Sequence, residues 1–191
     1  MTRERPKYRY RVDARDVIVS VDSWWLAFAR ENGAPELTAE RVVGRSLWDY
    51  VEGGEVQRTY RALHDRIRAT KTCAAASYRC DSPTLRRDMQ LTITPSTDGC
   101  LQYESVIVRV TPAPYVGLFD AVRPRSKSVL TVCSHCRRAL LEPHGWLDPD
   151  AVSDRLQRAS RWRWPQIRHV LCPNCSKSLG AVPAGPAAAA D

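Results

Sequence analysis

The chain has 191 residues, enough for one medium-sized domain and a small second one. No stretch reaches the roughly 20 apolar residues that a membrane span needs, and the first residues lack the apolar core of a signal peptide, so we expect a cytoplasmic protein without membrane contact. Basic residues exceed acidic ones by eight, which permits contact with nucleic acid or another polyanion but does not require it.

The first part of the chain contains both strand and helix patterns. Residues 16–21, DVIVSV, are rich in β-branched side chains and indicate a strand. A short helix is expected at 23–32, with Ser23 as a candidate N-cap and Gly33 at its end. The clearest amphipathic helix is predicted at 54–70. Four residues recur along it at helical spacing: Val56, Tyr60, Leu63 and Ile67.

Beyond this helix the period of the apolar residues changes to two. Residues 74–80 are a candidate strand, and residues 88–94 alternate apolar and polar side chains. Residues 101–110 follow across the turn sequence PSTDG, which predicts an antiparallel hairpin. Strands and helices in this order indicate an α+β fold.

The composition changes again at residues 112–128, which contain three prolines, a glycine and little periodicity. We interpret this segment as a linker between a first domain at 10–111 and a second at 129–180. Residues 181–191 have almost nothing to bury and are expected to be a disordered tail.

The N-terminal region resembles a PAS domain. In residues 17–51, VIVSVDSWWLAFARENGAPELTAERVVGRSLWDYV, a strand ends at an aspartate, a short helix follows, and VGRSLWD supplies the glycine-centred segment of that family. The long helix and the hairpin fall where the family has its long helix and its last two strands. The resemblance covers residues 10–111. It implies a five-stranded antiparallel sheet with helices over one face, in a domain that senses, dimerises or relays a signal.

Some PAS domains hold a cofactor between the long helix and the sheet. The resemblance therefore makes Trp24, Tyr60, Leu63 and His64 candidates for a ligand pocket, although core packing is the simpler role for Trp24 and its neighbour Trp25. Haem-binding members use a histidine on or near the long helix, but one histidine without supporting spacing argues for a hydrogen-bonded side chain at the edge of the apolar stripe. The flavin-binding branch needs an Asn-Cys-Arg-Phe-Leu-Gln type motif, which this chain lacks. We therefore expect no flavin and argue against haem.

Two Cys-x-x-Cys pairs mark the C-terminal region: Cys133 with Cys136, and Cys172 with Cys175. A tight turn lets both thiolates of a pair reach the same ion, and four thiolates suit tetrahedral Zn²⁺. Because four thiolates leave no open position, the site should be structural and should supply folding free energy to a small unit. An iron–sulfur cluster remains an alternative, whereas a redox pair would need a thioredoxin-like setting that is absent.

Two histidines lie near the pairs, His135 and His169. Since four cysteines already fill the site, we expect both histidines to support the ligands by hydrogen bonding rather than to bind the ion. A helix is predicted between the pairs at 148–160.

The segment 131–179 is similar to a small module at the C-terminal end of some bacterial PAS and sensor-kinase-like proteins. The chain departs from the module's pattern by Arg137 in place of lysine and Val170 in place of glycine. The similarity supports the architecture and brings no firmly assigned activity. Matching positions are Cys133, Cys136, Arg137, Gly145, Trp146, Val152, His169, Cys172, Pro173 and Cys175.

The leading hypothesis is a non-enzymatic bacterial signalling protein. In it a PAS-like ligand-binding or dimerisation domain is coupled to a structural zinc module that contacts a protein partner or a second copy. No histidine-kinase core, receiver, nucleotide-cyclase motif or Gly-rich phosphate loop is recognisable in the sequence.

The alternative is a nucleic-acid-binding transcriptional regulator that uses residues 155–169. Arginines there could contact phosphates while Trp162 and Trp164 stack on exposed bases. A solvated basic surface, with one tryptophan packed against the zinc hairpin, is the plainer explanation because no DNA-reading helix is discernible. The candidate contacts are Arg155, Arg158, Arg161, Arg163 and Arg168.

Overall fold

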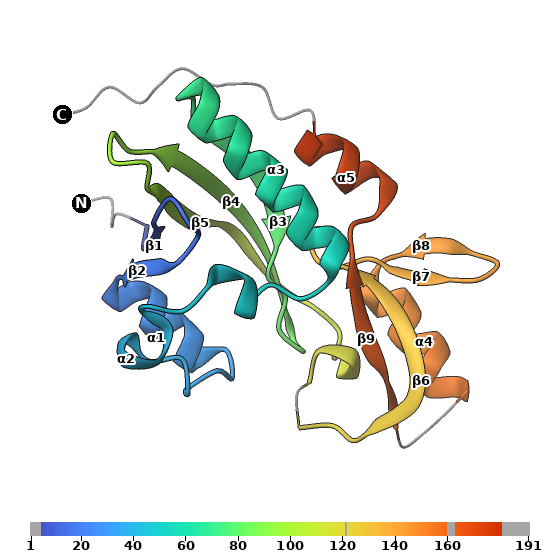
Figure 1. The fold of residues 1–191 in the computed structure, drawn as a ribbon. Coiled ribbons are helices and arrows are strands. Elements are labelled where there is room, and N and C mark those ends of the chain that lie inside the picture. The colour runs from blue at the N-terminus through green and yellow to red at the C-terminus, as the bar shows by residue number, and fades with distance from the viewer. Residues whose placement is uncertain (1–4, 121, 160–162, 181–191) are drawn as a thin grey trace.

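The computed structural model describes residues 5–120, 122–159 and 163–180, apart from the side chains of 157–159. Its first sheet has five strands in the order β2-β1-β5-β4-β3, and every neighbouring pair is antiparallel (Figure 1). The strands are β1 (Lys7–Val12), β2 (Ile18–Val21), β3 (Ala74–Arg79), β4 (Leu85–Pro95) and β5 (Leu101–Pro112). The α+β class and the five-stranded antiparallel sheet are thereby confirmed. Strand β1 was not recognised from the sequence, because KYRYRV alternates basic and aromatic residues.

Four helical elements connect β2 to β3: α1 (Ser23–Glu31), α2 (Ala39–Val42), the 3₁₀ turn η1 (Leu47–Asp49) and α3 (Gly54–Thr70). The bounds of α3 are those that the apolar spacing predicts. The predicted N-cap of α1 was wrong by one residue. Asp22 caps the helix, because its carboxylate accepts a hydrogen bond of 2.7 Å from the backbone N–H of Trp25.

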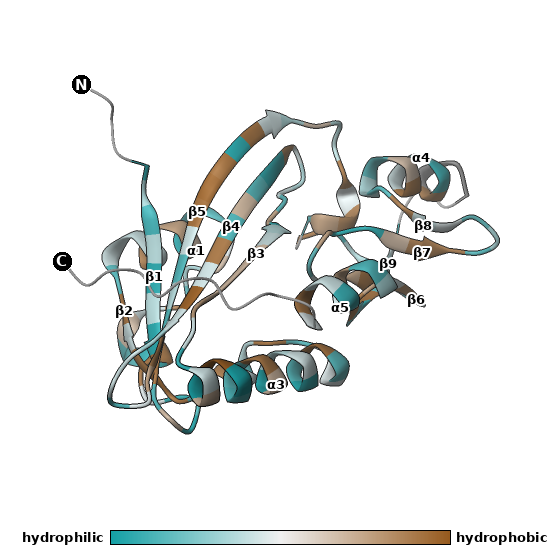
Figure 2. Cartoon of the chain, turned by 90° about the horizontal axis from the view of Figure 1, so that it is seen from above, coloured by the Kyte–Doolittle hydropathy of each residue, from teal (hydrophilic) through white to brown (hydrophobic). Residues whose placement is uncertain are grey.

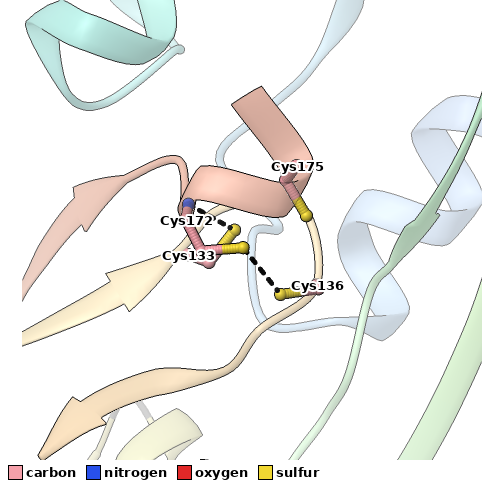
Figure 3. A group of neighbouring side chains, drawn as sticks. All are labelled: Cys133, Cys136, Cys172 and Cys175. Carbon is pink, nitrogen blue, oxygen red and sulfur yellow. Dashed lines mark hydrogen bonds between the residues drawn. The ribbon is translucent and has the colours of Figure 1, made fainter. Parts of the chain in front are cut away.

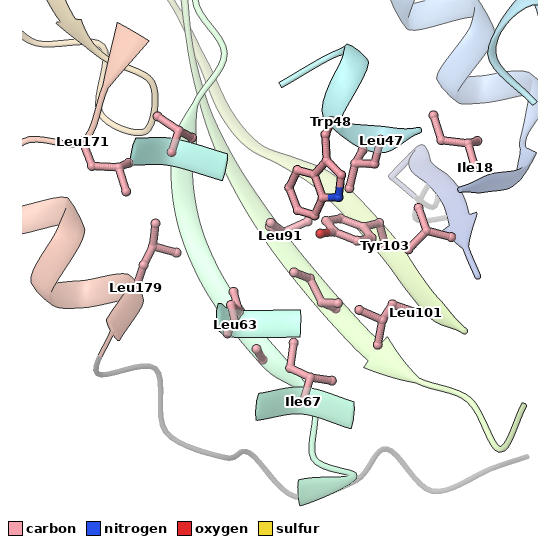
Figure 4. Packing of buried hydrophobic residues seen from close by; sticks show 14 of the residues in the cluster. Ile18, Leu47, Trp48, Leu63, Ile67, Leu91, Leu101, Tyr103, Leu171 and Leu179 are labelled. Atoms are coloured by element: carbon pink, nitrogen blue, oxygen red, sulfur yellow. The ribbon is translucent and has the colours of Figure 1, made fainter. Parts of the chain in front are cut away.

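Helix α3 packs its apolar stripe on the sheet. Val56, Leu63 and Ile67 are buried, as the helical spacing predicts. They join Leu91 and Leu101 in one continuous core (Figure 4).

The second sheet has four strands in the order β8-β7-β6-β9. They are β6 (Arg125–Cys133), β7 (Ala139–Leu141), β8 (Gly145–Leu147) and β9 (Trp164–Val170), accompanied by helices α4 (Pro149–Ala159) and α5 (Pro173–Gly180). Strands β6 and β9 are parallel, so their carboxyl ends lie side by side. Because one cysteine pair follows each strand end, this pairing brings the four cysteines together.

The predicted linker is largely ordered and belongs to the second unit. It contains the 3₁₀ turn η2 (Gly117–Phe119), and Leu118 is fully buried. Gly117 is required by packing, because a Cβ at this position would collide with the indole of Trp164. The predicted tail, 181–191, lies outside the described residues.

The two units are in direct contact. Helix α5 lies beside α3 in both views of the chain (Figures 1 and 2), and Leu171 and Leu179 join the core of the first unit (Figure 4). The guanidinium of Arg66 donates to the carbonyl oxygen of Gly180 at 2.7 Å. Gly53 has a φ of +91°, and a Cβ there would collide with the carbonyl oxygen of His169. In the part of the chain described, no helix combines the length and apolar character needed to cross a bilayer.

Candidate metal centre and ligand cavity

The four predicted cysteines converge at one point (Figure 3). All four Sγ atoms lie within 4.8 Å of one another. The Sγ atoms of Cys136 and Cys172 are 3.7 Å apart. Four thiolates at the Zn–S distance of about 2.3 Å in a tetrahedron would be roughly 3.8 Å apart. The donor set and its spacing therefore fit a tetrahedral zinc ion held by Cys133, Cys136, Cys172 and Cys175.

Two tight turns aim the sulfurs at this point. After Cys133, the backbone N–H of Arg137 donates to the carbonyl oxygen of Cys133 at 2.9 Å, and Arg137 takes a left-handed φ of +63° to close the loop. The second pair lies at the start of α5. There the N–H of Cys172 donates to the Sγ of Cys133 at 3.3 Å, which ties the two pairs together (Figure 3).

The cysteine thiols shift one another's pKa through hydrogen bonds. Hydrogen bonds from Cys136 and then Cys175 lower the pKa of Cys133, whereas the hydrogen bond with Cys133 raises the pKa of Cys136 and of Cys175. Zinc needs the thiolate form of each ligand, so its binding releases protons and adds binding energy to the fold.

The two nearby histidines have other roles than the predicted support of the cysteines. His169 forms a hydrogen bond of 3.2 Å with the hydroxyl of Ser134, and its Nε2 lies 3.1 Å from the carboxylate of Glu52. His135 is buried, its backbone carbonyl accepts from Arg79 at 2.7 Å, and burial lowers its pKa. No hydrogen bond joins either imidazole to a cysteine sulfur among the described residues. Both histidines instead line a cavity beside the metal centre.

This cavity has a volume of about 810 Å³ and lies between the first sheet and the cysteine loop. Its wall on the side of the first unit comes from α1, η1, α3 and the strands β1, β3, β4 and β5. Its wall on the side of the second unit comes from Ser134, His135, Arg137 and His169. A molecule bound here would contact both units at once.

Aromatic side chains make up much of the cavity lining. Tyr10 and Tyr103 stack with ring centroids 4.4 Å apart, and Tyr78 donates to Ser105 at 3.1 Å. Burial raises the pKa of Tyr78 to about 12 and raises that of Tyr60 further. Both hydroxyls are therefore protonated at neutral pH; that of Tyr78 already donates to Ser105, whereas that of Tyr60 can donate to a ligand.

Of the residues predicted to form a ligand pocket, one lines this cavity and the others do not. Tyr60 lines it, but Leu63 and His64 lie in the core behind it. Trp24 is 56% exposed, and its neighbour Trp25 lines the cavity instead. Adjacent residues on a helix point in different directions, and the sequence alone did not say which of the two faces inward.

A polar network that the sequence did not reveal lies beneath the cavity. Asp16, with a left-handed φ of 62°, accepts hydrogen bonds from Trp48 Nε1 at 3.1 Å and from Arg68 at 2.6 Å, and pairs with His64 Nδ1 at 2.8 Å. The other ring nitrogen of His64 contacts the hydroxyl of Tyr103, which lines the cavity. His64 is fully buried, and both its ring nitrogens have partners there.

The basic segment 155–169 runs from the end of α4 into β9. Trp164 packs against Gly117 inside the second unit. Arg155, Arg163 and Arg168 are exposed. The side chain of Arg158 and all of Arg161 and Trp162 lie outside the described residues.

No family model and no curated protein matches the chain. Solved structures align with part of it. A sensory box sensor histidine kinase from Vibrio cholerae is 12% identical over 56% of this chain and 84% of its own, with a TM-score of 0.40. The PAS domain of the Cronobacter turicensis RpfR quorum-sensing receptor, in complex with BDSF, is 12% identical over 57% of this chain and 100% of its own, with a TM-score of 0.36.

The Aer2 receptor of Vibrio cholerae, a dual PAS-heme oxygen sensor, is 14% identical over 55% of this chain and 96% of its own, with a TM-score of 0.37. Similarities at this level add no weight to the fold assignment. The assignment rests on the sheet itself, whose five antiparallel strands and intervening helices agree with what the PAS resemblance implies.

Proposed function

We propose that this is a non-enzymatic signalling protein, whose PAS-like domain binds a small molecule in the cavity beside the cysteine centre. The observation that carries the proposal is the construction of the cavity, whose walls come from both units. Its volume of about 810 Å³ lies within the range of about 300–1,000 Å³ typical of small-molecule sites. Binding would favour one arrangement of the two units and thereby alter the surface offered to a protein partner or a second copy.

The metal centre has a structural role in this proposal. Zinc bound by the four thiolates would cross-link the ends of β6 and β9 and supply no reactive position. The residues Ser134, His135 and Arg137 lie within or directly after the first cysteine turn. Their place in the cavity wall therefore depends on the same four sulfurs.

The proposed ligand is not haem or flavin. Both ring nitrogens of His64 already have partners, Asp16 and Tyr103, so iron ligation would require breaking one of these contacts. Metal analysis and an absorption spectrum of the purified protein test this point. We expect one zinc per chain and no visible absorption, whereas a Soret or flavin band would contradict the proposal.

Hydrogen exchange measured with and without N-phenyl-1-naphthylamine, a neutral aromatic probe, tests the cavity. We expect slower exchange in β4 and β5 and also in the 133–137 loop, because a ligand would contact both walls. Slower exchange in the first unit alone would contradict the coupling, and no change anywhere would contradict the ligand site.

A pair of variants provides the control. Ser105 lines the cavity, so Ser105→Phe should fill it and abolish the effect of the probe. Ser77, on β3, is exposed and does not line the cavity, so Ser77→Phe adds the same ring without changing the response.

A further inference from the structure

Three residues that line the cavity each have a buried polar side-chain atom without a hydrogen-bond partner in the part of the protein that the structure describes. Within the described residues, three buried side-chain nitrogen or oxygen atoms lack a partner: Asn32 Oδ1, His135 Nε2 and Arg137 Nε. All three residues line this one cavity. Native proteins leave few buried polar atoms without a partner, and each costs about 1–3 kcal/mol. A group from outside the chain that reached these atoms, whether a ligand or water, would remove this cost.

Two of these three residues come from the cysteine loop. His135 is only 7% exposed, and its side chain contacts the ring of Tyr78 with centroids 6.0 Å apart. Arg137 lies two residues further on, and its guanidinium carbon is 4.2 Å from the ring centroid of Phe119. Both side chains therefore pack against aromatic rings, while His135 Nε2 and Arg137 Nε have no hydrogen-bond partner in the described part of the protein.

The guanidinium of Arg137 is a half-buried cation without an acidic partner. No described carboxylate lies within ion-pair distance of it, and neighbouring acids are already engaged. Asp81 pairs with Arg79 at 2.5 Å, and Glu52, which lines the cavity, pairs with His169 at 3.1 Å. Zinc thiolates would attract the guanidinium at longer range, but no sulfur accepts a hydrogen bond from its Nε. An arginine in this setting is well suited to bind an anion.

The rest of the lining favours a flat apolar body. Tyr8, Tyr10, Trp25, Phe28, Trp48 and Tyr60 all contribute aromatic surface to the cavity. Aromatic rings bind other flat rings through offset-stacked and edge-on contacts. An acyl chain would use this surface less completely.

We propose that the cavity takes an aromatic acid. Its acidic group is bound by Arg137 and His135 of the cysteine loop, and its ring lies among the aromatic residues of the first unit. A donor group on the ligand would satisfy Asn32 Oδ1, whose own Nδ2 already donates to the carbonyl oxygen of Phe28 at 2.8 Å. This inference rests on the proposed function and specifies the ligand class of the same site.

Two fluorescent probes with nearly the same body test it: 8-anilinonaphthalene-1-sulfonate, which is anionic, and N-phenyl-1-naphthylamine, which is neutral. We expect one molecule of the anionic probe per chain, bound about tenfold or more tightly than the neutral one, because a charge-assisted bond to arginine accounts for a difference of this size. Arg137→Met should remove this preference and change neutral-probe binding less than about twofold.

Arg138→Met is the matched control, since Arg138 is the adjacent arginine, has a side chain 47% exposed and does not line the cavity. It should leave both affinities unchanged. Zinc content and melting temperature, measured for both variants, establish that the fold is intact. If Arg137→Met loses its zinc or its fold, Arg137→Lys replaces it as the test variant. Arg137→Lys keeps the positive charge and must therefore still bind the anionic probe more tightly than the neutral one.

The outcomes separate the two proposals. Equal binding of both probes, or an anionic preference that survives in folded Arg137→Met, overturns the aromatic-acid inference while leaving a ligand-binding cavity in place. Failure of both probes to bind overturns the inference and the proposed function together.

Discussion

The two units of the chain are stabilised in different ways. The first buries a continuous core around Ile67, Ile93 and Leu101, each 2% exposed or less. The second has a smaller cluster, with Val132 and Val152 at its centre, and gathers four thiols at one end. Yet Cys133 and Cys172 also belong to the core of the first unit. The cysteine cluster therefore belongs both to the small unit and to the contact between the two units.

The largest effect should come from removing one thiolate. Cys172→Ser should lose the bound zinc, because apparent binding energies of structural zinc sites are on the order of 10 kcal/mol and a hydroxyl is a poor substitute for a thiolate. We expect protease to cut the segment from about residue 130 to 179 while a fragment ending near Pro112, where β5 ends, is protected. Metal analysis and limited proteolysis measure both results.

Chelation of zinc from the wild-type protein should reproduce this cleavage pattern. Two results would contradict the comparison. Complete protease resistance without metal would mean that the cysteines do not hold the second unit together. Simultaneous loss of both units would mean that their shared core makes them a single cooperative domain.

The next largest effect concerns the buried network of the first unit. Asp16→Asn leaves Arg68 and His64 without their carboxylate, and breaking a buried pair costs about 3–5 kcal/mol. Asparagine tolerates the left-handed φ of this position, so the loss would reflect charge rather than backbone strain. Chemical unfolding measures the free energy.

The matched control for this variant is Glu104→Gln, which removes a more exposed carboxylate paired with Lys7 and Arg9. It should cost less than about 1 kcal/mol, as exposed ion pairs do. Similar losses in the two variants would show that burial of the Asp16 network does not matter for stability.

A third variant probes the shared core from the side of the second unit. Leu179→Ala should cost about 2–5 kcal/mol, because Leu179 is 2% exposed and packs with the residues of the first core. Leu63→Ala, from the first unit, should cost a similar amount. Val129→Ala is the control, since Val129 is 49% exposed and should change stability by less than about 0.5 kcal/mol. A negligible loss for Leu179→Ala would separate the two units energetically.

The smallest effect should be a difference in acid stability. Burial acts to raise the pKa of Asp16, but hydrogen bonds from His64 and then Arg68 outweigh it and lower the pKa below its ordinary value. The stabilisation is therefore complete above the unfolded pKa of about 3.9 and is lost as the pH falls through the lower folded value. The stability gap between wild type and Asp16→Asn should narrow below about pH 4. Both proteins carry the same cysteines, so thiolate protonation cancels, and a constant gap would contradict the assignment.

Local patterns in the sequence predicted most of the elements and the four cysteines that the structure brings together. The bounds of α3 follow from its apolar spacing, and the two Cys-x-x-Cys turns single out the four cysteines because each pair is a pattern of neighbouring residues. Strand β1 was missed because its alternating basic and aromatic residues do not show the apolar alternation of a typical strand. The Asp22 cap was missed because Asp22 and Ser23 are adjacent and either can cap a helix.

The cavity and the buried network could not be predicted in this way. His64 contacts Asp16, which is 48 residues away along the chain, and Tyr103, which is 39 residues away. Arg137 stands beside a cysteine in sequence, and only the packing of the cysteine loop against the first sheet places it in the wall of the cavity. The sequence by itself determined which residues can bind a metal and which helix is amphipathic, because both depend on neighbours a few positions away. The tertiary structure alone decided which aromatic and polar side chains face one another across the two units, because such contacts depend on how distant segments pack.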